Sequence, residues 1–232
     1  MPSSQAEWDE KHKLAVKGTP AEGPAEILCE LWPLLQGRVE VRQGGGVKPP
    51  LHGGMALDLA CGTGRNALFL AEHGHHVTAV DWSGAALDIL ESRALEKGIP
   101  VRRIHKIEEV RQSRHSGIDL LQADLEKLAV PANSYELILC IRYLQRSLFP
   151  QIRSALRPGG MLLFETYTRA QLEFSRGPRD PNHLLNRGEL KGAFPGLTVI
   201  FHRELRGGQA IASLLARKDA RRDRSSNQNG EQ

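Results

Sequence analysis

Short apolar runs alternate with stretches of helical spacing from Met55 to about residue 166. Each run is five to seven residues long and rich in aliphatic side chains, which is typical of buried strands in a parallel sheet. Near the end of the chain, two β-rich runs flank a Gly-Gly turn and predict a hairpin. The pattern therefore predicts an α/β fold, a doubly wound and mostly parallel sheet of seven strands with an antiparallel terminal hairpin. The predicted strands are 55–60, 76–80, 118–122, 135–141, 160–166, 197–205 and 210–217.

Helices are predicted in the stretches between these strands. One helix covers about 66–73, and Ser83 caps a second helix that ends before Gly98. A third, which contains a proline, covers about 147–156. Residues 101–117 fit the alternation poorly, because they suit either a charged surface helix or an extra strand plus a loop. We treat them as an insertion.

The chain divides into three parts on composition. Residues 1–54 form an N-terminal segment with one helix, bent or shortened by Pro33, and a Gly/Pro-rich connector. Residues 55–217 form the main domain, and 218–232 are expected to be a disordered basic tail.

Composition and charge exclude several classes of protein. With 40% hydrophobic and 25% charged residues, the 232-residue chain is neither largely disordered nor fibrous. The formal net charge is +4, and residues 217–224 contribute +3 of it, so the body is nearly neutral and no nucleic-acid-binding face is expected. The three cysteines contain no CxxC pair, and the histidines at 73, 75 and 76 lack partners at ligand spacing, so neither a disulfide framework nor a metal site is expected.

Two features concern location. The first residues are polar where a signal peptide needs an apolar stretch, and no segment approaches the roughly 18 apolar residues of a membrane span. We therefore expect a cytoplasmic protein without a membrane partner. The sequence leaves the oligomeric state open.

The strongest chemical signal is a glycine turn that follows the first predicted strand. Gly62 and Gly64 allow a tight turn at the carboxyl end of that strand, where open α/β sheets bind ligands. Together with Ala67 they satisfy the dinucleotide spacing G-x-G-x-x-A, which alone is a weak match. Asp58, four positions before Gly62, would repel a pyrophosphate but favour a ligand that carries an ammonium and a sulfonium. S-adenosylmethionine carries both, although Asp58 could instead only accept hydrogen bonds from the turn.

Further candidates follow the next two strands. Asp81 can accept both hydroxyls of a ribose, which suits either this cofactor or a nicotinamide dinucleotide. Trp82 offers a flat face to an adenosine or is an ordinary packing residue. Asp124 can accept a hydrogen bond from the adenine amino group, with Leu125 against the ring, or it caps a helix.

The stretch LDLACGTGRNALFLAEHGHHVTAVDWS, with ADLEKL, YELILCIRYL and LRPGGMLLFET, resembles the class I S-adenosylmethionine-dependent methyltransferases over about residues 55–217. Within them it is most similar to the small-molecule, tellurite-resistance-type (thiopurine-like) branch. The resemblance implies a Rossmann-like fold, S-adenosyl-L-methionine as the cofactor, and LRPGG as a helix-to-strand turn. The residues expected to bind this cofactor are Asp58, Cys61, Gly62, Gly64, Asn66, Asp81, Trp82, Asp124, Leu125 and Ile141.

The acceptor side is less determined. Methyl transfer from a sulfonium is an in-line displacement, so the enzyme mainly aligns the acceptor and excludes water. Amino-directed enzymes usually carry an Asn/Asp-Pro-Pro-aromatic motif after the strand that corresponds to 135–141, and this motif is absent here. Arg142, Tyr143 and Arg146 follow the strand instead, and they favour a small polar or anionic acceptor. The loop 176–190 with His183 is a second candidate wall, or a surface loop with solvated arginines. We take Arg142, Tyr143 and His183 as the catalytic candidates.

Alternative functions remain open at this point. A methyltransferase that acts on RNA or protein would need a basic, aromatic surface, which 5% aromatic residues do not supply. An NAD(P)-dependent oxidoreductase or a non-catalytic nucleotide-binding module would also use the glycine turn. Trp8, Asp9 and Glu10 either fold over the cofactor as a lid or belong to a disordered N-terminus.

Overall fold

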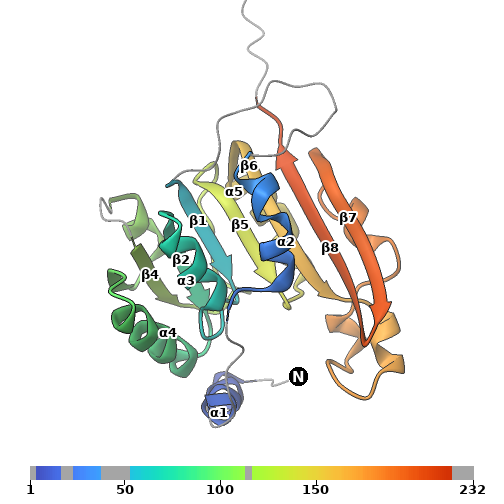
Figure 1. Ribbon diagram of the computed structural model, residues 1–232, viewed down its shortest axis with the longest axis horizontal. Helices are drawn as coiled ribbons and strands as arrows, with labels where there is room; N and C mark the ends of the chain where they lie inside the picture. Colours follow the sequence, from blue (N-terminus) through green and yellow to red (C-terminus); the bar gives the residue numbers. More distant parts are fainter. Residues whose placement is uncertain (1–3, 17–22, 38–52, 113–116, 221–232) are drawn as a thin grey trace, which may run out of the picture.

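The computed structural model describes residues 4–16, 23–37, 53–112 and 117–220. These residues form one eight-stranded sheet in the order β3-β4-β2-β1-β5-β6-β8-β7 (Figure 1). The strands from β3 to β6 are parallel, and β8 and β7 close the sheet as an antiparallel hairpin. The α/β class with a terminal hairpin is therefore confirmed. The strands are β1 Met55–Leu59, β2 His76–Asp81, β3 Val101–Ile104, β4 Gly117–Gln122, β5 Tyr135–Ile141, β6 Leu156–Tyr167, β7 Leu197–Gly207 and β8 Gln209–Lys218.

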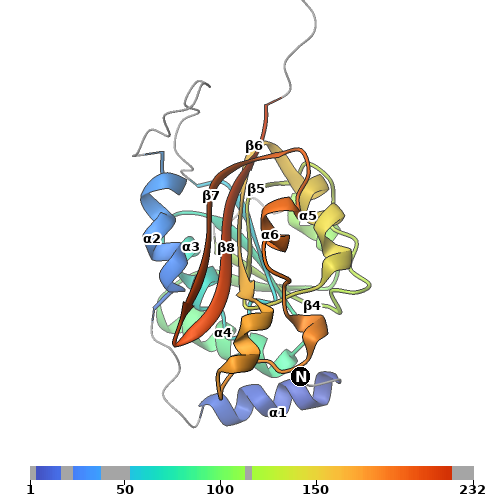
Figure 2. The same ribbon diagram turned by 90° about the vertical axis from the view of Figure 1, so that its right-hand side faces the viewer.

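Helices cover both faces of the sheet, as doubly wound folds require. One face carries α2, α3 and α4, and the other carries α5 and α6 (Figure 2). A further helix, α1, lies past the carboxyl ends of the central strands (Figures 1 and 2). The helices are α1 Gln5–Val16, α2 Glu26–Leu35, α3 Arg65–Glu72, α4 Gly84–Glu96, α5 Phe149–Ala155 and α6 Glu189–Gly192, with 3-10 turns η1 Ile107–Gln112, η2 Arg146–Leu148, η3 Arg169–Glu173 and η4 Pro181–His183.

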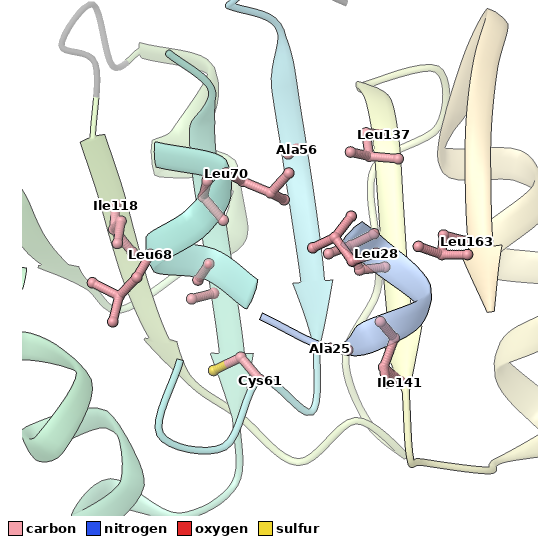
Figure 3. Close-up of a cluster of buried hydrophobic side chains, with 14 of the residues drawn as sticks. Ala25, Leu28, Ala56, Cys61, Leu68, Leu70, Ile118, Leu137, Ile141 and Leu163 are labelled. Carbon is pink, nitrogen blue, oxygen red and sulfur yellow. The ribbon is translucent and has the colours of Figure 1, made fainter. Parts of the chain in front are cut away.

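The core forms where the helices press aliphatic side chains onto the two faces of the sheet. In Figure 3, Leu28 of α2 lies between Ala56 of β1, Leu137 of β5 and Leu163 of β6. All four side chains are fully buried. The helix α2 comes from the predicted N-terminal segment, yet its apolar face completes the core of the main domain. Its first turn is also tied to α3, because the Ala25 amide donates to Asn66 Oδ1 at 2.8 Å.

Local sequence signals correctly predicted a helix cap, a helix end and the hairpin turn. The side chain of Ser83 accepts a hydrogen bond from the Ala86 amide and so caps α4. Gly98 adopts a φ of +67° just past the end of that helix, a conformation that glycine adopts without strain. The hairpin turns at Gly208, which has a φ of +70°.

Three expectations need correction. Residues 101–117 are no insertion, because Val101–Ile104 form β3, the eighth strand and one edge of the sheet. The segment LRPGG belongs to β6 rather than to a turn, where it forms an irregularity: Tyr135 pairs with Leu156, but Leu137 already pairs with Met161. The described residues before β1 form two helices where one is expected from the sequence, because α1 is mostly polar and its few apolar side chains do not gather on one face.

Some expectations lie outside the described residues. The Gly/Pro-rich connector falls mostly in 38–52, and the basic tail falls mostly in 221–232. The division into three parts stays a prediction. Across the part of the chain that the structure describes, no helix has the length and apolar character that a bilayer crossing requires.

The order of the strands marks the position of a ligand site. From β1 the chain continues to β2 and β4 on one side, and it later returns to β5 on the other side. In open α/β sheets such a switch point leaves a crevice at the carboxyl ends of the two strands. The crevice here lies at the ends of β1 and β5, below which α1 lies in Figure 1.

Candidate cofactor and acceptor site

The glycine turn after β1 is held by backbone hydrogen bonds. The Cys61 amide donates to the Val80 carbonyl of the neighbouring strand, and the Gly64 amide donates back to the Cys61 carbonyl, both at 3.0 Å. Gly62 and Gly64 have φ angles of +55° and +79°, in the left-handed region that disfavours other residues. The turn is thus rigid before any ligand binds.

The two glycines of this turn serve different purposes. A Cβ on Gly64 would lie 2.1 Å from Leu90 Cδ1, so this glycine is required by the packing of α4 against the turn. A Cβ on Gly62 would meet only the His12 ring of α1, at 3.6 Å. Gly62 is therefore the position at which the turn faces the crevice, and Gly64 is structural in the first place.

Asp58 is buried at the base of the crevice with a hydrogen-bonding position unused. Its side chain is 1% exposed, the Ala67 amide donates to the carboxylate, and Oδ2 has no partner. Burial and, to a lesser extent, the charge of Asp81 raise the pKa of Asp58 to about 7, although Arg65 and the Ala67 amide oppose the rise. A cationic group would relieve this unpaired buried charge, so the site fits the ammonium or sulfonium end of S-adenosylmethionine and is unsuited to a diphosphate.

Asp81 ends β2 with its carboxylate held in place. Oδ2 accepts from the Gly62 amide at 2.7 Å and Oδ1 accepts from the Ser83 amide at 2.9 Å. Burial raises the pKa of Asp81, and these amides together with His12 oppose the rise. Each carboxylate oxygen can accept more than one hydrogen bond, so the group keeps capacity for the two hydroxyls of a ribose.

The helix α1 covers the crevice and is fastened to α4. Asp9 Oδ1 accepts from Ser83 Oγ at 2.5 Å and from the Ala85 amide at 3.1 Å. The ring of Trp8 stacks on His12, with centroids 5.8 Å apart. Burial lowers the pKa of His12, and the nearby Asp81 opposes this. Of the two alternatives for this segment, the structure favours the lid, and it adds His12, which sequence reasoning missed because nothing local marks it.

The residues expected around an adenine lie at the ends of β2 and β4. Trp82 is half-buried, and its carbonyl accepts from Gln122 Nε2 at 3.4 Å. Asp124 Oδ1 accepts from the Glu126 amide at 2.9 Å, as in an Asx turn, and Leu125 is buried. Asp124 thus begins a turn rather than a helix, which was the alternative left open, and its Oδ2 lies 3.2 Å from Lys127 Nζ with the side chain 22% exposed. Their roles as cofactor ligands stay predictions.

Tyr143 feels the charges of several acidic groups. Its hydroxyl donates to Gln145 Oε1 at 2.5 Å. Burial raises the pKa of Tyr143, and the negative charges of Asp124 and Asp81 add to the rise. The phenol therefore stays protonated near neutral pH and can donate a hydrogen bond, but it cannot act as a general base there.

Three other predicted cofactor ligands have structural contacts. Cys61 is buried and its thiol donates to the Gly62 carbonyl at 3.6 Å. The Asn66 side-chain oxygen is engaged by the Ala25 amide. Ile141 is buried at the end of β5 and belongs to the same core cluster as Cys61. Their assignment as cofactor ligands stays a prediction.

Arg146 differs from the expectation that it binds an anionic acceptor. Its guanidinium pairs with both carboxylate oxygens of Glu189, at 2.6 and 3.0 Å, and donates to the carbonyls of Asn182 and Leu184. These partners use the donors that an acceptor would need. Arg146 therefore fastens the 181–189 segment to η2 as a positioning residue.

The other two acceptor candidates are partly exposed. His183 lies in that fastened segment, with Nε2 3.8 Å from Asp180 Oδ2. Arg142 follows β5 in the left-handed conformation, with a φ of +64°, and its amide donates to the Glu165 carbonyl at 2.7 Å. No contact among the described residues joins His183 to Arg142. The structure thus places only Arg142 at the edge of the β1–β5 crevice.

The described residues hold no cluster of three or more His, Cys, Asp or Glu side chains suited to a metal ion. The chemistry of the crevice is that of two buried carboxylates beside a rigid glycine turn. Such a site, in an α/β domain, suits a nucleoside with a cationic substituent.

Comparison with known proteins agrees with this class. Residues 57–164 match the family model described as a methyltransferase domain. A ubiquinone biosynthesis O-methyltransferase from Escherichia fergusonii is 29% identical over 153 residues, which cover 64% of this chain and 55% of that protein. The chain thus spans about half the length of the curated relatives that it matches.

Solved structures share the fold. TehB from Haemophilus influenzae aligns with a TM-score of 0.57 at 19% identity, over 73% of this chain and 59% of that one. An S-adenosylmethionine dependent methyltransferase from Mesorhizobium loti aligns with a TM-score of 0.56 at 20% identity, over 81% of this chain and 97% of that one. The family model supports the expected methyltransferase domain over residues 57–164, and the expected Rossmann-like fold is confirmed. The tellurite-resistance-type branch is not.

Proposed function

We propose that this protein transfers a methyl group from S-adenosyl-L-methionine to a small polar or anionic molecule. The observation that carries the proposal is the unpartnered, buried Oδ2 of Asp58 at the switch point of the sheet. A buried carboxylate oxygen without a donor is unfavourable by itself, and a cationic ligand is the partner that best relieves it.

In this proposal each part of the crevice holds one part of the cofactor. Asp58 and Gly62 receive the methionine end, and Asp81 receives the ribose hydroxyls. Trp82, Asp124 and neighbouring Leu125 receive the adenine. When bound, S-adenosylmethionine supplies a methyl group that is already activated by its sulfonium.

The remaining work falls to groups of this chain. The lid α1, held by Asp9, excludes water from the crevice. Arg142 orients the acceptor, and Tyr143 would exchange the hydrogen bond that its protonated hydroxyl donates to Gln145 for one to the acceptor. His183, with its side chain 36% exposed, is the candidate for accepting a proton if the acceptor must lose one.

Two observations bear on the acceptor class. The curated relative named above is a ubiquinone biosynthesis O-methyltransferase, and its name suggests a hydroxyl acceptor. The resemblance to the tellurite-resistance-type branch suggests an oxyanion instead. A cytoplasmic location and the absence of a nucleic-acid partner remain predictions of the sequence.

Isotope transfer tests the proposal. Cofactor labelled with tritium in the methyl group is incubated with the protein and a metabolite extract, and the labelled product is identified by mass. We expect label in a small molecule, and Asp81→Asn weakens cofactor binding at least tenfold, whereas Asp88→Asn on the exposed side of α4 leaves it unchanged. No detectable binding at millimolar cofactor would refute the proposal.

A further inference from the structure

Arg142 and Arg146 follow the same strand but differ in how their guanidinium groups are satisfied. Arg146 makes four hydrogen bonds to side chains and carbonyls. The Arg142 side chain makes none with the described residues, and its Nη1 is buried without a partner. Its side chain is 28% exposed, so a ligand can reach it. Arg142 thus keeps the donors that Arg146 has used.

The Arg142 guanidinium is nevertheless held in place by residues that no sequence pattern marks. Glu165 Oε1 on β6 lies 3.4 Å from Arg142 Nη2. Glu165 is only 3% exposed, and its Oε2 accepts from Ser213 Oγ of β8 at 2.7 Å. The ring of Tyr167 lies under the guanidinium, 4.7 Å from Cζ to the centroid. Two neighbouring strands, β6 and β8, therefore contribute to one support.

The backbone at Arg142 is strained as well. A φ of +64° is rare outside glycine, and it persists where the surroundings enforce it. Here the Arg142 amide donates to the Glu165 carbonyl at 2.7 Å, which fixes the turn. The turn directs the side chain onto the end of β6 rather than along β5.

The position of this support suits an acceptor. Residues at the ends of β1 and β5 are neighbours, since Leu59 pairs with Cys140. Ile141, just before Arg142, pairs with Glu165. Neighbouring strands lie about 4.8 Å apart, so the guanidinium is about two strand spacings from the Asp58 strand or less. A molecule anchored there reaches the cofactor side of the crevice.

We propose that Arg142, supported by Glu165, Ser213 and Tyr167, forms a subsite for a monoanionic carboxylate on the methyl acceptor. The inference deepens the proposed function and rests on it, because only methyl transfer makes the molecule that carries this carboxylate a methyl acceptor. A planar guanidinium fork matches a carboxylate in two parallel hydrogen bonds. The buried Glu165 beside it balances most of the positive charge, which disfavours a phosphate dianion.

Probe molecules of known charge test the subsite directly. Ligand-observed NMR measures binding of benzoate, benzamide and phenyl phosphate to the protein in the presence of S-adenosylhomocysteine. We expect benzoate to bind at least tenfold more tightly than benzamide, and more tightly than phenyl phosphate. Arg142→Gln reduces benzoate affinity to that of benzamide, and Arg142→Lys restores part of it. Arg103→Gln, which removes the same charge at the opposite edge of the sheet, changes neither.

A second variant separates positioning from mere stability. Glu165→Gln keeps a side chain of the same shape beside Ser213 but removes the negative charge. We expect phenyl phosphate to gain at least fivefold relative to benzoate in this variant, a change of preference that a loosened fold does not produce. An unchanged ratio in Glu165→Gln, equal binding of benzoate and benzamide to the unmodified protein, or undiminished benzoate binding in Arg142→Gln overturns the inference.

A separate measurement tests the proposed function. Calorimetry measures the affinity of S-adenosylhomocysteine for the same samples. Loss of cofactor binding in the unmodified protein contradicts the proposed function, whereas the benzoate ratios report on the carboxylate subsite alone.

Discussion

Replacing Asp58 with asparagine removes a buried charge that destabilises the protein when no ligand is bound. The pKa of Asp58 rises from 3.8 to about 7 on folding. The pKa of Asp58 is higher in the folded than in the unfolded protein. The contribution of Asp58 to stability is therefore fully present only below the unfolded pKa, and it is lost as the pH rises through the folded pKa. The loss is about 2 kcal/mol at pH 5 and about 4 kcal/mol at pH 8.

The asparagine side chain does not ionise, so the variant avoids this pH-dependent loss of stability, but it introduces a smaller loss that does not depend on pH. Its amide donor replaces the carboxylate oxygen that has no partner, which costs about 1–3 kcal/mol at every pH. We therefore expect the unfolding free energy of Asp58→Asn, measured relative to that of the unmodified protein, to increase by about 2–3 kcal/mol from pH 5 to pH 8. The same variant loses affinity for the cationic cofactor.

Urea unfolding followed by far-UV circular dichroism at pH 5, 6, 7 and 8 measures both proteins without ligand. Asp88→Asn is the matched control, because its side chain is exposed and pairs only with the surface residue Arg103. Its difference from the unmodified protein stays constant with pH. If the stability profile of Asp58→Asn runs parallel to that of the unmodified protein, the carboxylate is not the strained group that we describe.

Three further changes follow from named contacts. Gly64→Ala forces a Cβ to within 2.1 Å of Leu90 Cδ1 and destabilises the protein by about 2–4 kcal/mol in urea unfolding. Asp9→Ala removes two hydrogen bonds of the lid and weakens cofactor binding about fivefold in calorimetry. Arg146→Gln releases Glu189 and speeds hydrogen exchange over 181–189 several-fold, while cofactor affinity stays the same.

Each change has an outcome that contradicts its reasoning. Gly74→Ala is the control for Gly64, because it shares a positive φ but nothing lies within 4 Å of its Cβ position; an equal loss in both variants removes the packing argument. Unchanged cofactor affinity in Asp9→Ala means that α1 is no lid. Unchanged exchange after Arg146→Gln means that other contacts hold the segment.

The parts of the fold that sequence predicted are those encoded locally. The glycine turn, closed by the Gly64 amide on the Cys61 carbonyl, and the cap at Ser83 each depend on residues within a few positions, so the pattern identifies them. The strand β3 escaped because Arg102 and Arg103 interrupt its apolar pattern. In the structure Arg102 pairs with the buried Asp119, and Arg103 pairs with acids of α4.

The parts of the site that sequence missed depend on contacts between distant segments. Asp9 meets Ser83 across 74 positions, and α1 has no apolar face that predicts where it docks. Glu165 lies within the apolar run 160–166, which predicts an ordinary buried strand. A carboxylate in a buried strand needs a partner, and that signal points to Arg142 at the end of the neighbouring strand.

The affinity for S-adenosylmethionine as a function of pH tests the central claim most directly. If ionised Asp58 receives the cationic end of the cofactor, the affinity rises nearly tenfold per unit from pH 5 to about pH 7 and then levels off. The profile is repeated in His12→Asn, because that imidazole also titrates beside Asp81. An affinity that does not change with pH in either protein, or a tighter binding of NADH than of S-adenosylmethionine, would contradict the account.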